Sequence, residues 1–308
     1  MLSEVSVIIP NYQCGAWLSR TIDSCLQQSE YLKEIIIVDD HSTDNSWEVL
    51  SQYQERYPRI IKVYRNLRKG GNNARNYGFS LSAGKYIQWL DADDQLLPGK
   101  FEAQLSLFEK IPAADIVYSD WRLETYDEKG DVIRREDKYH SQYTDFLLEL
   151  LVDNWSPPHN YLLKREIAAK LAAINAWNPE TPVLQDREYF TLAAMEGARF
   201  YYAAGCFCVY NRWNRNSVSK KNNPQLTIDL LEKFGGRVEE NKSLPAEKKR
   251  MYKKVLITAA ILTRLSGNSM LLKDRQLKFS NIYWPMVHSY KTRIKLLIAL
   301  TRNLSYSA

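Results

Sequence analysis

The first hundred residues alternate short apolar runs with helix-like segments, and few folds accommodate this order. Continuous apolar runs, typical of buried parallel strands, occupy residues 5–9, 34–38, 60–64 and 86–90. Helical spacing or capping signals separate them, at residues 17–28, 42–57 and 73–82. The order predicts an α/β fold with a mostly parallel sheet flanked by helices. In such sheets, ligands bind outside the carboxyl ends of the strands.

The second hundred residues continue the mixed pattern, and the last part of the chain is different. Further strands are predicted at residues 115–121 and 200–210, and helices at 143–152 and 186–197, while 161–173 should be a strand that runs into a helix. From Pro224 onward only helical patterns remain. We therefore expect a larger domain over residues 1–220 and a small helical region over residues 221–308.

Charge is distributed unevenly between these two parts. Residues 1–220 hold 25 Lys and Arg against 30 Asp and Glu, a net charge of −5, whereas residues 221–308 hold 17 against 6, a net charge of +11. A basic terminal region of this kind favours contact with an anionic surface, either membrane or nucleic acid. No leader segment and no apolar run near the ~20 residues of a membrane span is recognisable. We expect a cytoplasmic protein with peripheral membrane contact.

The cysteines and histidines do not form a metal site in the sequence. Four cysteines have no zinc-site spacing, and four histidines are scattered along the chain. The carboxylates are more informative, because Asp91 and Asp93 follow a buried strand directly. Two carboxylates one residue apart can share a hard cation, while a diphosphate supplies further oxygens. The alternative is a solvated acidic turn, with Asp94 as a helix cap.

Two other clusters also follow strands. Asp39, at the end of the second strand, can accept a hydrogen bond from a base or a ribose, while Thr43 and Asp44 are better explained as helix caps. In the segment 70–78, two glycines allow close approach of a ligand to the backbone, and Arg75 can reach a phosphate or a base. The alternative for Arg75 is a solvated side chain on a helix.

Taken together and in this order, the segments 5–12, 35–44, 71–78 and 86–94 resemble the family 2 glycosyltransferases. The resemblance covers roughly residues 3–219 and is strongest up to Pro98. It implies the GT-A fold over residues 1–220 and an inverting transfer of sugar from a nucleotide-diphosphate donor to a hydroxyl acceptor.

The resemblance also implies roles for single residues. Pro10 and Tyr12 would border the base, Asp39 would accept from uracil N3–H, and Arg75 would flank the nucleotide, so a UDP-sugar is the expected donor. Asp91 would contact the ribose or a metal-bound water. Asp93 would bind the Mg²⁺ or Mn²⁺ that the diphosphate carries.

A later acidic residue matches the catalytic base of the family. The family has a Glu-Asp pair at the start of a helix, and this chain has Gln185 followed by Asp186. An ionised base is favoured at a helix N-terminus, from which Asp186 would deprotonate the acceptor hydroxyl. The alternative is that Asp186 is an ordinary N-cap.

The segment 210–219 resembles the part of the family that closes over the diphosphate. Asn214 stands where the family usually has a histidine, which leaves a contact by that histidine in doubt, while Arg212 and Arg215 can still pair with phosphate. A basic surface loop is the alternative.

The acceptor is poorly defined by the sequence. A saccharide or a lipid-linked saccharide is expected, in the synthesis of a polysaccharide or glycoconjugate, with no nucleic acid beyond the nucleotide. Aromatic and polar candidates for stacking on it are Trp121, Asn154, Trp155, His159 and Trp177, although buried tryptophans are more often core residues.

A rival hypothesis is a nucleotide-binding interaction module that has lost catalysis. Asp91, Asp93 and Asp186 argue against this hypothesis, and Gln185 and Asn214 argue for it. A nucleotidyltransferase or a dinucleotide oxidoreductase is disfavoured, because no Gly-rich phosphate loop follows the first strand.

The C-terminal region contains amphipathic patterns. One stripe is expected over residues 287–302, with Lys291, Lys295 and Arg302 on its flank. A second joins Met251, Val255, Leu262 and Leu265. These helices should pack on the catalytic domain or on a second subunit in a homo-oligomer, with the outward basic side meeting a membrane.

Overall fold

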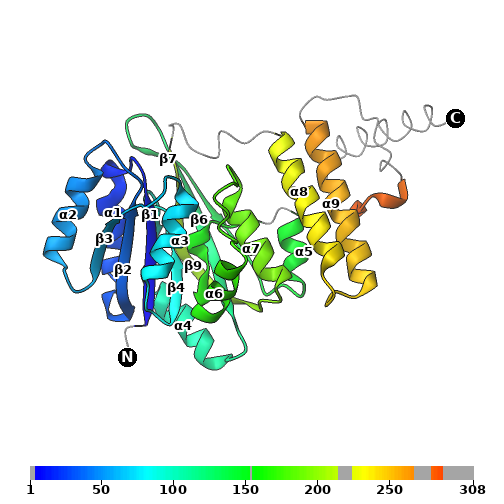
Figure 1. Cartoon of the computed structure of the whole chain (residues 1–308), viewed down its shortest axis with the longest axis horizontal. Helices are drawn as coiled ribbons and strands as arrows, with labels where there is room; N and C mark the ends of the chain where they lie inside the picture. The colour runs from blue at the N-terminus through cyan, green and yellow to red at the C-terminus, as the bar shows by residue number, and fades with distance from the viewer. Residues whose placement is uncertain (1–3, 153–154, 214–223, 267–278, 287–308) are drawn as a thin grey trace. The chain divides into compact units, whose positions relative to one another are not determined.

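The computed structural model describes residues 4–152, 155–213, 224–266 and 279–286, and these fold as two compact units (Figure 1). The first unit comprises residues 1–144 and 156–217, and the second comprises residues 145–155 and 218–308. A short segment from the middle of the chain therefore groups with the C-terminal residues.

A sheet runs through the first unit, and its N-terminal half is parallel. Strands β1 (Val5–Asn11), β2 (Leu32–Asp39), β3 (Ile61–Arg65) and β4 (Tyr86–Trp89) lie in the order β3-β2-β1-β4. The apolar residues of β1, β2 and β4 are almost completely buried, because helices cover both faces of a parallel sheet. The predicted fold class, an α/β sheet flanked by helices, is confirmed.

The other half of the sheet is mixed. It continues from β4 through β8 (Leu162–Lys164), β6 (Ile116–Tyr126), β9 (Phe200–Arg212) and β5 (Gln95–Leu96), and β7 (Val132–Lys138) pairs with β6, which gives nine strands within the described residues. Strands β6 and β9 are parallel, whereas β8, β7 and β5 pair antiparallel with their neighbours. The long β9 thus lies between β6 and β5 in the sheet.

Six α-helices belong to the described part of the first unit. They are α1 (Gly15–Leu26), α2 (Ser46–Arg56), α3 (Gly71–Leu81), α4 (Lys100–Lys110), α6 (Arg165–Ala173) and α7 (Gln185–Met195). One carboxylate caps two of them: Asp44 accepts from the backbone N–H of Gly15 (3.0 Å) and of Ser46 (3.0 Å). Such caps satisfy backbone donors that no helix can satisfy internally.

Helix α3 lies close against the sheet, and a glycine makes this approach feasible. A Cβ atom at Gly78 would lie 2.6 Å from Cγ2 of Ile8, so a larger residue would push the helix away from β1. Ala74, one turn earlier, packs in a fully buried cluster with Ile36 and Val38 of β2. The packing of Gly78 and Ala74 against β1 and β2 holds the N-terminal end of α3, with Arg75, at the carboxyl end of the sheet.

The register of the central strands brings their carboxyl ends to one edge. Asn11 of β1 is the partner of Asp39 of β2, and Ile8 of β1 pairs with Trp89 of β4. The polar segments that follow β1, β2 and β4 therefore leave the sheet side by side.

The second unit is helical. It contains α5 (Phe146–Leu151), α8 (Pro224–Glu240), α9 (Ala246–Ser266) and the short 3₁₀ helices η4 (Phe279–Asn281) and η5 (Trp284–Met286). Helices α8 and α9 pack together through buried side chains that include Phe234, Val238, Val255 and Ile261. The expected stripe over residues 287–302 lies outside the described residues.

Asp145 organises part of this unit. Its carboxylate accepts from the backbone of Leu148, which caps α5, and from Lys248 Nζ (2.9 Å) and Tyr252 Oη (2.8 Å) of α9.

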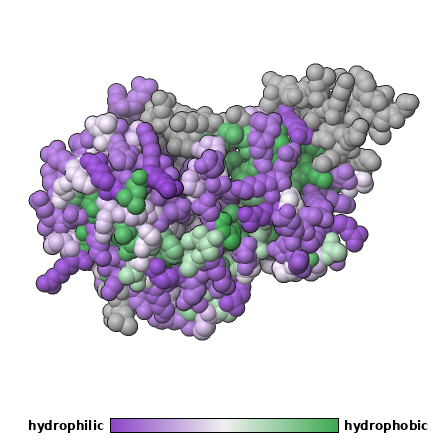
Figure 2. All heavy atoms as spheres, viewed as in Figure 1, coloured by the Kyte–Doolittle hydropathy of each residue, from purple (hydrophilic) through white to green (hydrophobic). Residues whose placement is uncertain are grey.

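Hydrophilic residues dominate the face of the molecule shown in Figure 2. Among the described residues, no helix combines the length and the apolar character that crossing a bilayer requires.

Candidate functional site

The acidic turn after β4 is anchored through its backbone. The turn closes with a hydrogen bond from the N–H of Asp94 to the carbonyl of Asp91 (3.1 Å), and the hydroxyl of Thr21 donates to the carbonyl of Ala92 (2.9 Å). Because the backbone is held from both sides, the side chains of Asp91 and Asp93 start from defined positions. Both are partly exposed, as a ligand would require.

Asn211, near the end of β9, clips this turn to the other half of the sheet. Its backbone N–H donates to Asp94 Oδ1 (2.7 Å), and its side-chain amide donates to the carbonyl of Asp93 (2.7 Å). Asn211 is buried, so these bonds are shielded from water. Asn211 lies in the segment 210–219 that resembles the family, but no local pattern gave it a role, because none indicates a contact across more than a hundred residues.

Arg212 follows this clip directly, and its side chain lies elsewhere. Successive residues of a strand point to opposite faces. A hydrogen bond from Lys138 lowers the pKa of Glu136 in β7, and the positive charges of Arg134 and Arg212 contribute to the same shift. Arg212 thus acts on β7 while Asn211 holds the acidic turn.

The pKa of the Tyr210 hydroxyl is affected by the carboxylates of the site. Burial raises the pKa of Tyr210, and the negative charges of Asp94, Asp91, Asp93 and Asp186 raise it further. The charges of carboxylates in the β4 turn and in helix α7 therefore both act on one side chain of β9, although almost a hundred residues separate Asp186 from the turn in the chain.

Arg75 connects the acidic turn with the start of α7. Its guanidinium donates to Asp91 Oδ1 (2.7 Å), to Asn72 Oδ1 (3.1 Å) and to Gln185 Oε1 (3.3 Å). Only 8% of Arg75 is exposed. The buried charge is therefore paired with one carboxylate, since Gln185 offers a neutral oxygen.

The ring of Trp177 packs against the guanidinium of Arg75. The guanidinium carbon of Arg75 lies 4.6 Å from the centre of the Trp177 ring, which itself stacks on Tyr189 with centroids 4.3 Å apart. Trp177 is 2% exposed, and the candidates Trp121 and His159 are also buried. These three aromatic residues are core residues of the site rather than a surface for stacking an acceptor.

The start of α7 has an unusual backbone conformation. Leu184 has a φ of +57°, in the left-handed region that a branched side chain rarely adopts. Neighbouring bonds hold the turn: Gln185 Nε2 donates to the carbonyl of Thr181 (3.0 Å), and Thr181 Oγ1 donates to Glu188 (2.5 Å). The conformation of Leu184 sets the direction in which α7 begins, and Asp186 lies in the first turn of this helix. Backbone outliers of this kind concentrate at functional sites.

Asp39, at the end of β2, is a heavily bonded carboxylate. It accepts from Asn11 Nδ2 (2.7 Å), from the backbone N–H of Ser42 (3.1 Å) and from Arg65 Nη1 (2.5 Å), and it is completely buried. A carboxylate has about four lone-pair sites, so one is left over, and it faces the protein interior in this conformation. Arg65 in turn lies 3.7 Å above the centre of the Trp47 ring.

The neighbouring Asp40 holds the loop that leads into α3. It accepts from Asn66 Nδ2 (2.7 Å) and from the backbone N–H of Gly70 (2.8 Å). The sequence analysis gave Asp40 no role, although its position directly after Asp39 at a strand end was the available signal.

The remaining predicted nucleotide contacts lie at the end of β1. Pro10 is the partner of Val38 in the sheet, and Tyr12 follows two residues later with 49% of its surface exposed. Lys69 Nζ lies 5.7 Å from the centre of the Tyr12 ring. The exposed ring therefore lies near the loop that Asp40 holds through Gly70.

Two basic side chains, His159 and Lys100, are completely buried in this part of the molecule. His159 Nδ1 is 3.4 Å from Asp94 Oδ2, and burial lowers the pKa of His159 to about 3, so the ring is neutral. Burial also lowers the pKa of Lys100 to about 8, while its ammonium donates to Gln104 Oε1 (2.9 Å). Neither side chain is accessible to a ligand.

The residues present fit a divalent cation as a pair of ligands. Among the described residues, no group of three or more His, Cys, Asp or Glu forms a metal site. Asp91 and Asp93 provide hard oxygen donors, and Mg²⁺ or Mn²⁺ bound with a diphosphate takes its other ligands from phosphate and water. A cation held by Asp91 and Asp93 would therefore need further oxygen ligands from outside this pair.

Comparison with known proteins identifies related sequences. The model of glycosyl transferase family 2 matches residues 6–171. An uncharacterized glycosyltransferase of Nostoc sp., alr2836, is 32% identical over 177 residues, which are 56% of this chain and 54% of that protein. The Escherichia coli protein named UDP-Glc:alpha-D-GlcNAc-diphosphoundecaprenol beta-1,3-glucosyltransferase WfaP is 37% identical over 34% of this chain and 41% of its own length. The chain thus matches about half or less of these relatives.

Solved structures share the fold. Staphylococcus aureus TarS, residues 1–349, has a TM-score of 0.65 at 13% identity, covering 99% of this chain and 91% of that one. It has also been solved with UDP-GlcNAc, with a TM-score of 0.62 at 14% identity over 97% and 80% of the two chains. The mannosyltransferase PcManGT of Pyrobaculum calidifontis, in complex with GDP-Man and Mn²⁺, has a TM-score of 0.52 at 18% identity over 98% and 87%. The predicted GT-A-type fold is confirmed.

Proposed function

We propose that this chain, which belongs to glycosyl transferase family 2, moves a sugar from a UDP-sugar to a hydroxyl acceptor with inversion at the anomeric carbon. One observation carries the proposal: the guanidinium of Arg75 donates to Asp91 Oδ1 (2.7 Å) and to Gln185 Oε1 (3.3 Å), so the residue that precedes Asp186 lies at the acidic turn. A donor-binding pair of carboxylates and a candidate base then share one site, as a transfer reaction requires.

The donor would lie along the carboxyl ends of the strands. In our proposal Pro10 and Tyr12 border the base, the remaining acceptor site of Asp39 takes uracil N3–H, and Arg75 flanks the nucleotide. Arg212 would reach phosphate only by turning from β7. Structures of TarS with UDP-GlcNAc, and the UDP-Glc in the name of WfaP, favour a uracil nucleotide.

Asp91 and Asp93 are the residues that would hold Mg²⁺ or Mn²⁺, together with oxygens of the diphosphate. When bound, the cation neutralises the charge that develops on the leaving diphosphate. The Mn²⁺ complex of PcManGT supports this assignment. Arg75 keeps the carboxylate of Asp91 oriented, so Asp93 is the residue on which metal binding should depend most.

Asp186 would act as the general base. It accepts the proton of the acceptor hydroxyl while that oxygen forms its bond to the anomeric carbon and the bond from this carbon to the UDP oxygen breaks. UDP leaves with the electron pair of the broken bond, and attack from the opposite side inverts the configuration. The α7 N-terminus favours the ionised form of Asp186 that this step needs.

The wider role follows from the relatives and the charge. We propose that residues 1–220 form the catalytic domain and act on a saccharide or lipid-linked saccharide in polysaccharide or glycoconjugate synthesis, as the name of WfaP suggests. The net charge of +11 over residues 221–308 supports a cytoplasmic location with peripheral contact to the inner face of the membrane, and the helices would also serve a homo-oligomer.

A second candidate function is a nucleotide-binding module without catalysis. Gln185 favours it, because the family has Glu at this position and Arg75 here faces a neutral amide oxygen. Release of UDP from a UDP-sugar in the presence of an acceptor extract would distinguish an enzyme from such a module.

The donor can be tested by thermal shift. UDP-, GDP- and TDP-sugars are added with and without Mn²⁺, since a ligand of the native state raises the apparent melting temperature. We expect the largest increase with a UDP-sugar and Mn²⁺. An equal response to all three nucleotides, or no response to any, would contradict the proposed donor.

A further inference from the structure

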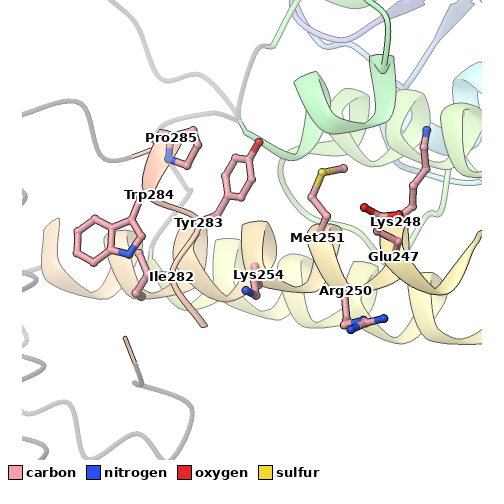
Figure 3. A pocket seen from close by; sticks show the side chains of 9 residues that line it. All are labelled: Glu247, Lys248, Arg250, Met251, Lys254, Ile282, Tyr283, Trp284 and Pro285. Carbon is pink, nitrogen blue, oxygen red and sulfur yellow. The ribbon is translucent and has the colours of Figure 1, made fainter. Parts of the chain in front are cut away.

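A groove in the second unit combines cationic and aromatic side chains, and the proposed reaction does not use it. It has a volume of about 940 Å³ and runs between α9 and residues 282–285 (Figure 3). Glu247, Arg250, Met251 and Lys254 line it from α9, and Tyr283 and Trp284 line it from the facing segment. The α9 residues are spaced three and four apart, which places them on one side of the helix.

The aromatic wall of the groove is held in place. Ile282 is 4% exposed and anchors the segment in the core of the unit. The backbone N–H of Tyr283 donates to Thr258 Oγ1 (2.8 Å), and that hydroxyl donates to the carbonyl of Lys254 (2.7 Å). The backbone that carries the rings of Tyr283 and Trp284 is therefore fixed relative to α9 before any ligand binds, which reduces the ordering cost of binding.

The charge of the groove is positive and not neutralised locally. Lys248, at one end, is paired with Asp145 (2.9 Å). Within the described residues, Arg250 and Lys254 have exposed side chains, and neither makes an ion pair or a side-chain hydrogen bond. Glu247 is the one acidic residue in the described part of the chain that lines the groove, so it offsets at most one of these two positive charges and a net positive charge remains.

We propose that this groove binds an anionic glycan chain, with its acidic groups on Arg250 and Lys254 and a sugar ring against Trp284. Cations supply charge complementarity for acidic groups, and an aromatic face offers a flat apolar surface to a sugar ring. A concave groove suits a flexible chain, whereas a flat bilayer would contact a convex surface. As a site for the acceptor polymer, the assignment rests on the proposed transferase function.

Calorimetry on the full chain tests the proposal. The probes are a polygalacturonate decamer, an uncharged dextran decamer and inorganic polyphosphate. We expect the polygalacturonate to bind, and Arg250→Gln with Lys254→Gln to weaken it by about tenfold, because each exposed ionic contact contributes up to ~1 kcal/mol. Trp284→Ala should weaken polygalacturonate several-fold and leave polyphosphate unchanged. The matched control replaces two exposed lysines away from the groove, Lys233→Gln with Lys242→Gln, and should change affinity less than twofold.

Three outcomes would overturn the assignment. Equal losses in the groove variant and the control would mean that only net charge matters, and equal binding of dextran and polygalacturonate would remove the role of the cations. Loss of binding to phosphatidylglycerol vesicles in the groove variant, without glycan binding by the wild type, would make the groove a membrane contact. The thermal shift with UDP is measured on every variant, so that failure of the donor site is distinguished from failure of the groove.

Discussion

The strand ends of the first unit and the groove of the second unit hold their charged side chains differently. In the first unit, the acidic side chains at the strand ends are fixed by specific donors: Asp39 accepts three hydrogen bonds, and Asp91 pairs with the buried Arg75. In the second unit, Arg250 and Lys254 are exposed and make no ion pair within the described residues. Substitutions at the strand ends should therefore change UDP binding or turnover by large factors. Substitution of a single exposed cation in the groove should change ligand affinity by a small, salt-sensitive factor.

The largest effect is expected for Asp186→Asn. Asn caps a helix about as well as Asp, so folding and UDP binding should be retained. The amide cannot accept a proton, and loss of a general base typically costs ~10²–10⁴-fold in rate. Turnover of a UDP-sugar and UDP affinity are measured on the same preparation.

Undiminished turnover in this variant would leave Asp186 as a cap. The base would then be sought among Asp120, Asp153 and Glu188. Asp120 is bonded to Tyr202 Oη (2.9 Å) and Glu188 to Thr181, so both are already engaged, and Asp153 lies outside the described residues.

The next largest effect is expected for Asp93→Asn on UDP binding in the presence of Mn²⁺. Loss of an outer partner of a metal site costs about 10–100-fold in metal affinity, and loss of a direct ligand should cost at least as much. Calorimetry with Mn²⁺ and with EDTA provides the measurement. Asp131→Asn, at the exposed hairpin turn, removes the same charge as a control. Equal UDP affinity with Mn²⁺ and with EDTA in the wild type would remove the metal role.

Arg75→Met should affect stability as well as donor binding. The free energy of unfolding should fall by about 1–2 kcal/mol, because Asp91 loses its partner but is partly accessible to water. Arg68→Met, in the exposed part of the preceding loop, should change it by less than ~0.5 kcal/mol. Urea unfolding gives both values. Equal stability of the two variants would mean that the Arg75–Asp91 pair does not contribute.

Asp39→Ala tests whether a structural carboxylate also recognises the base. One lost hydrogen bond to uracil should reduce the preference for UDP over GDP by about three- to tenfold, with little change in metal dependence. The melting temperature should fall too, since Asn11, Ser42 and Arg65 lose their acceptor. If the variant melts earlier but binds UDP as tightly as the wild type, Asp39 is a structural residue only.

The smallest effect concerns the second unit, where the carboxylate of Asp145 is mostly buried and pairs with Lys248. Burial acts to raise the pKa of Asp145, but hydrogen bonds from Lys248 and Tyr252 outweigh burial and lower it. A lowered pKa in the folded state stabilises the protein above the unfolded value of about 3.9, and this contribution is lost as the pH falls through the folded pKa. Asp145→Ala should therefore cost about 1 kcal/mol at pH 7 and less near pH 3.

Thermal unfolding at the two pH values measures this difference. Asp229→Ala, at an exposed position of α8, is the control and should show no comparable dependence on pH. A penalty for Asp145→Ala that is the same at pH 7 and pH 3 would exclude a contribution from the ionised carboxylate.

Several features of the candidate site could be predicted from the sequence because their signals are local. Apolar runs and helical spacing predicted β1, β2, β4 and α3, and the edge rule for parallel sheets predicted where the following polar residues would gather. The cap by Asp44 is also local to the start of α2. The burial of Trp121 and Trp177 agrees with the expectation that such tryptophans are more often core residues, but no local signal showed that Trp177 packs against Arg75.

The sequence by itself determined the order of strands and helices, the carboxylates at strand ends and the charge difference between the two parts of the chain. Each of these depends on residues close together in the chain. The tertiary structure alone decided that Asn211 clips the Asp93–Asp94 turn, that Arg75 reaches Gln185 at a separation of 110 residues, and that residues 145–155 group with the C-terminal helices. These contacts depend on the strand order β4-β8-β6-β9-β5, which no local periodicity specifies, because strand pairing joins segments far apart in the chain.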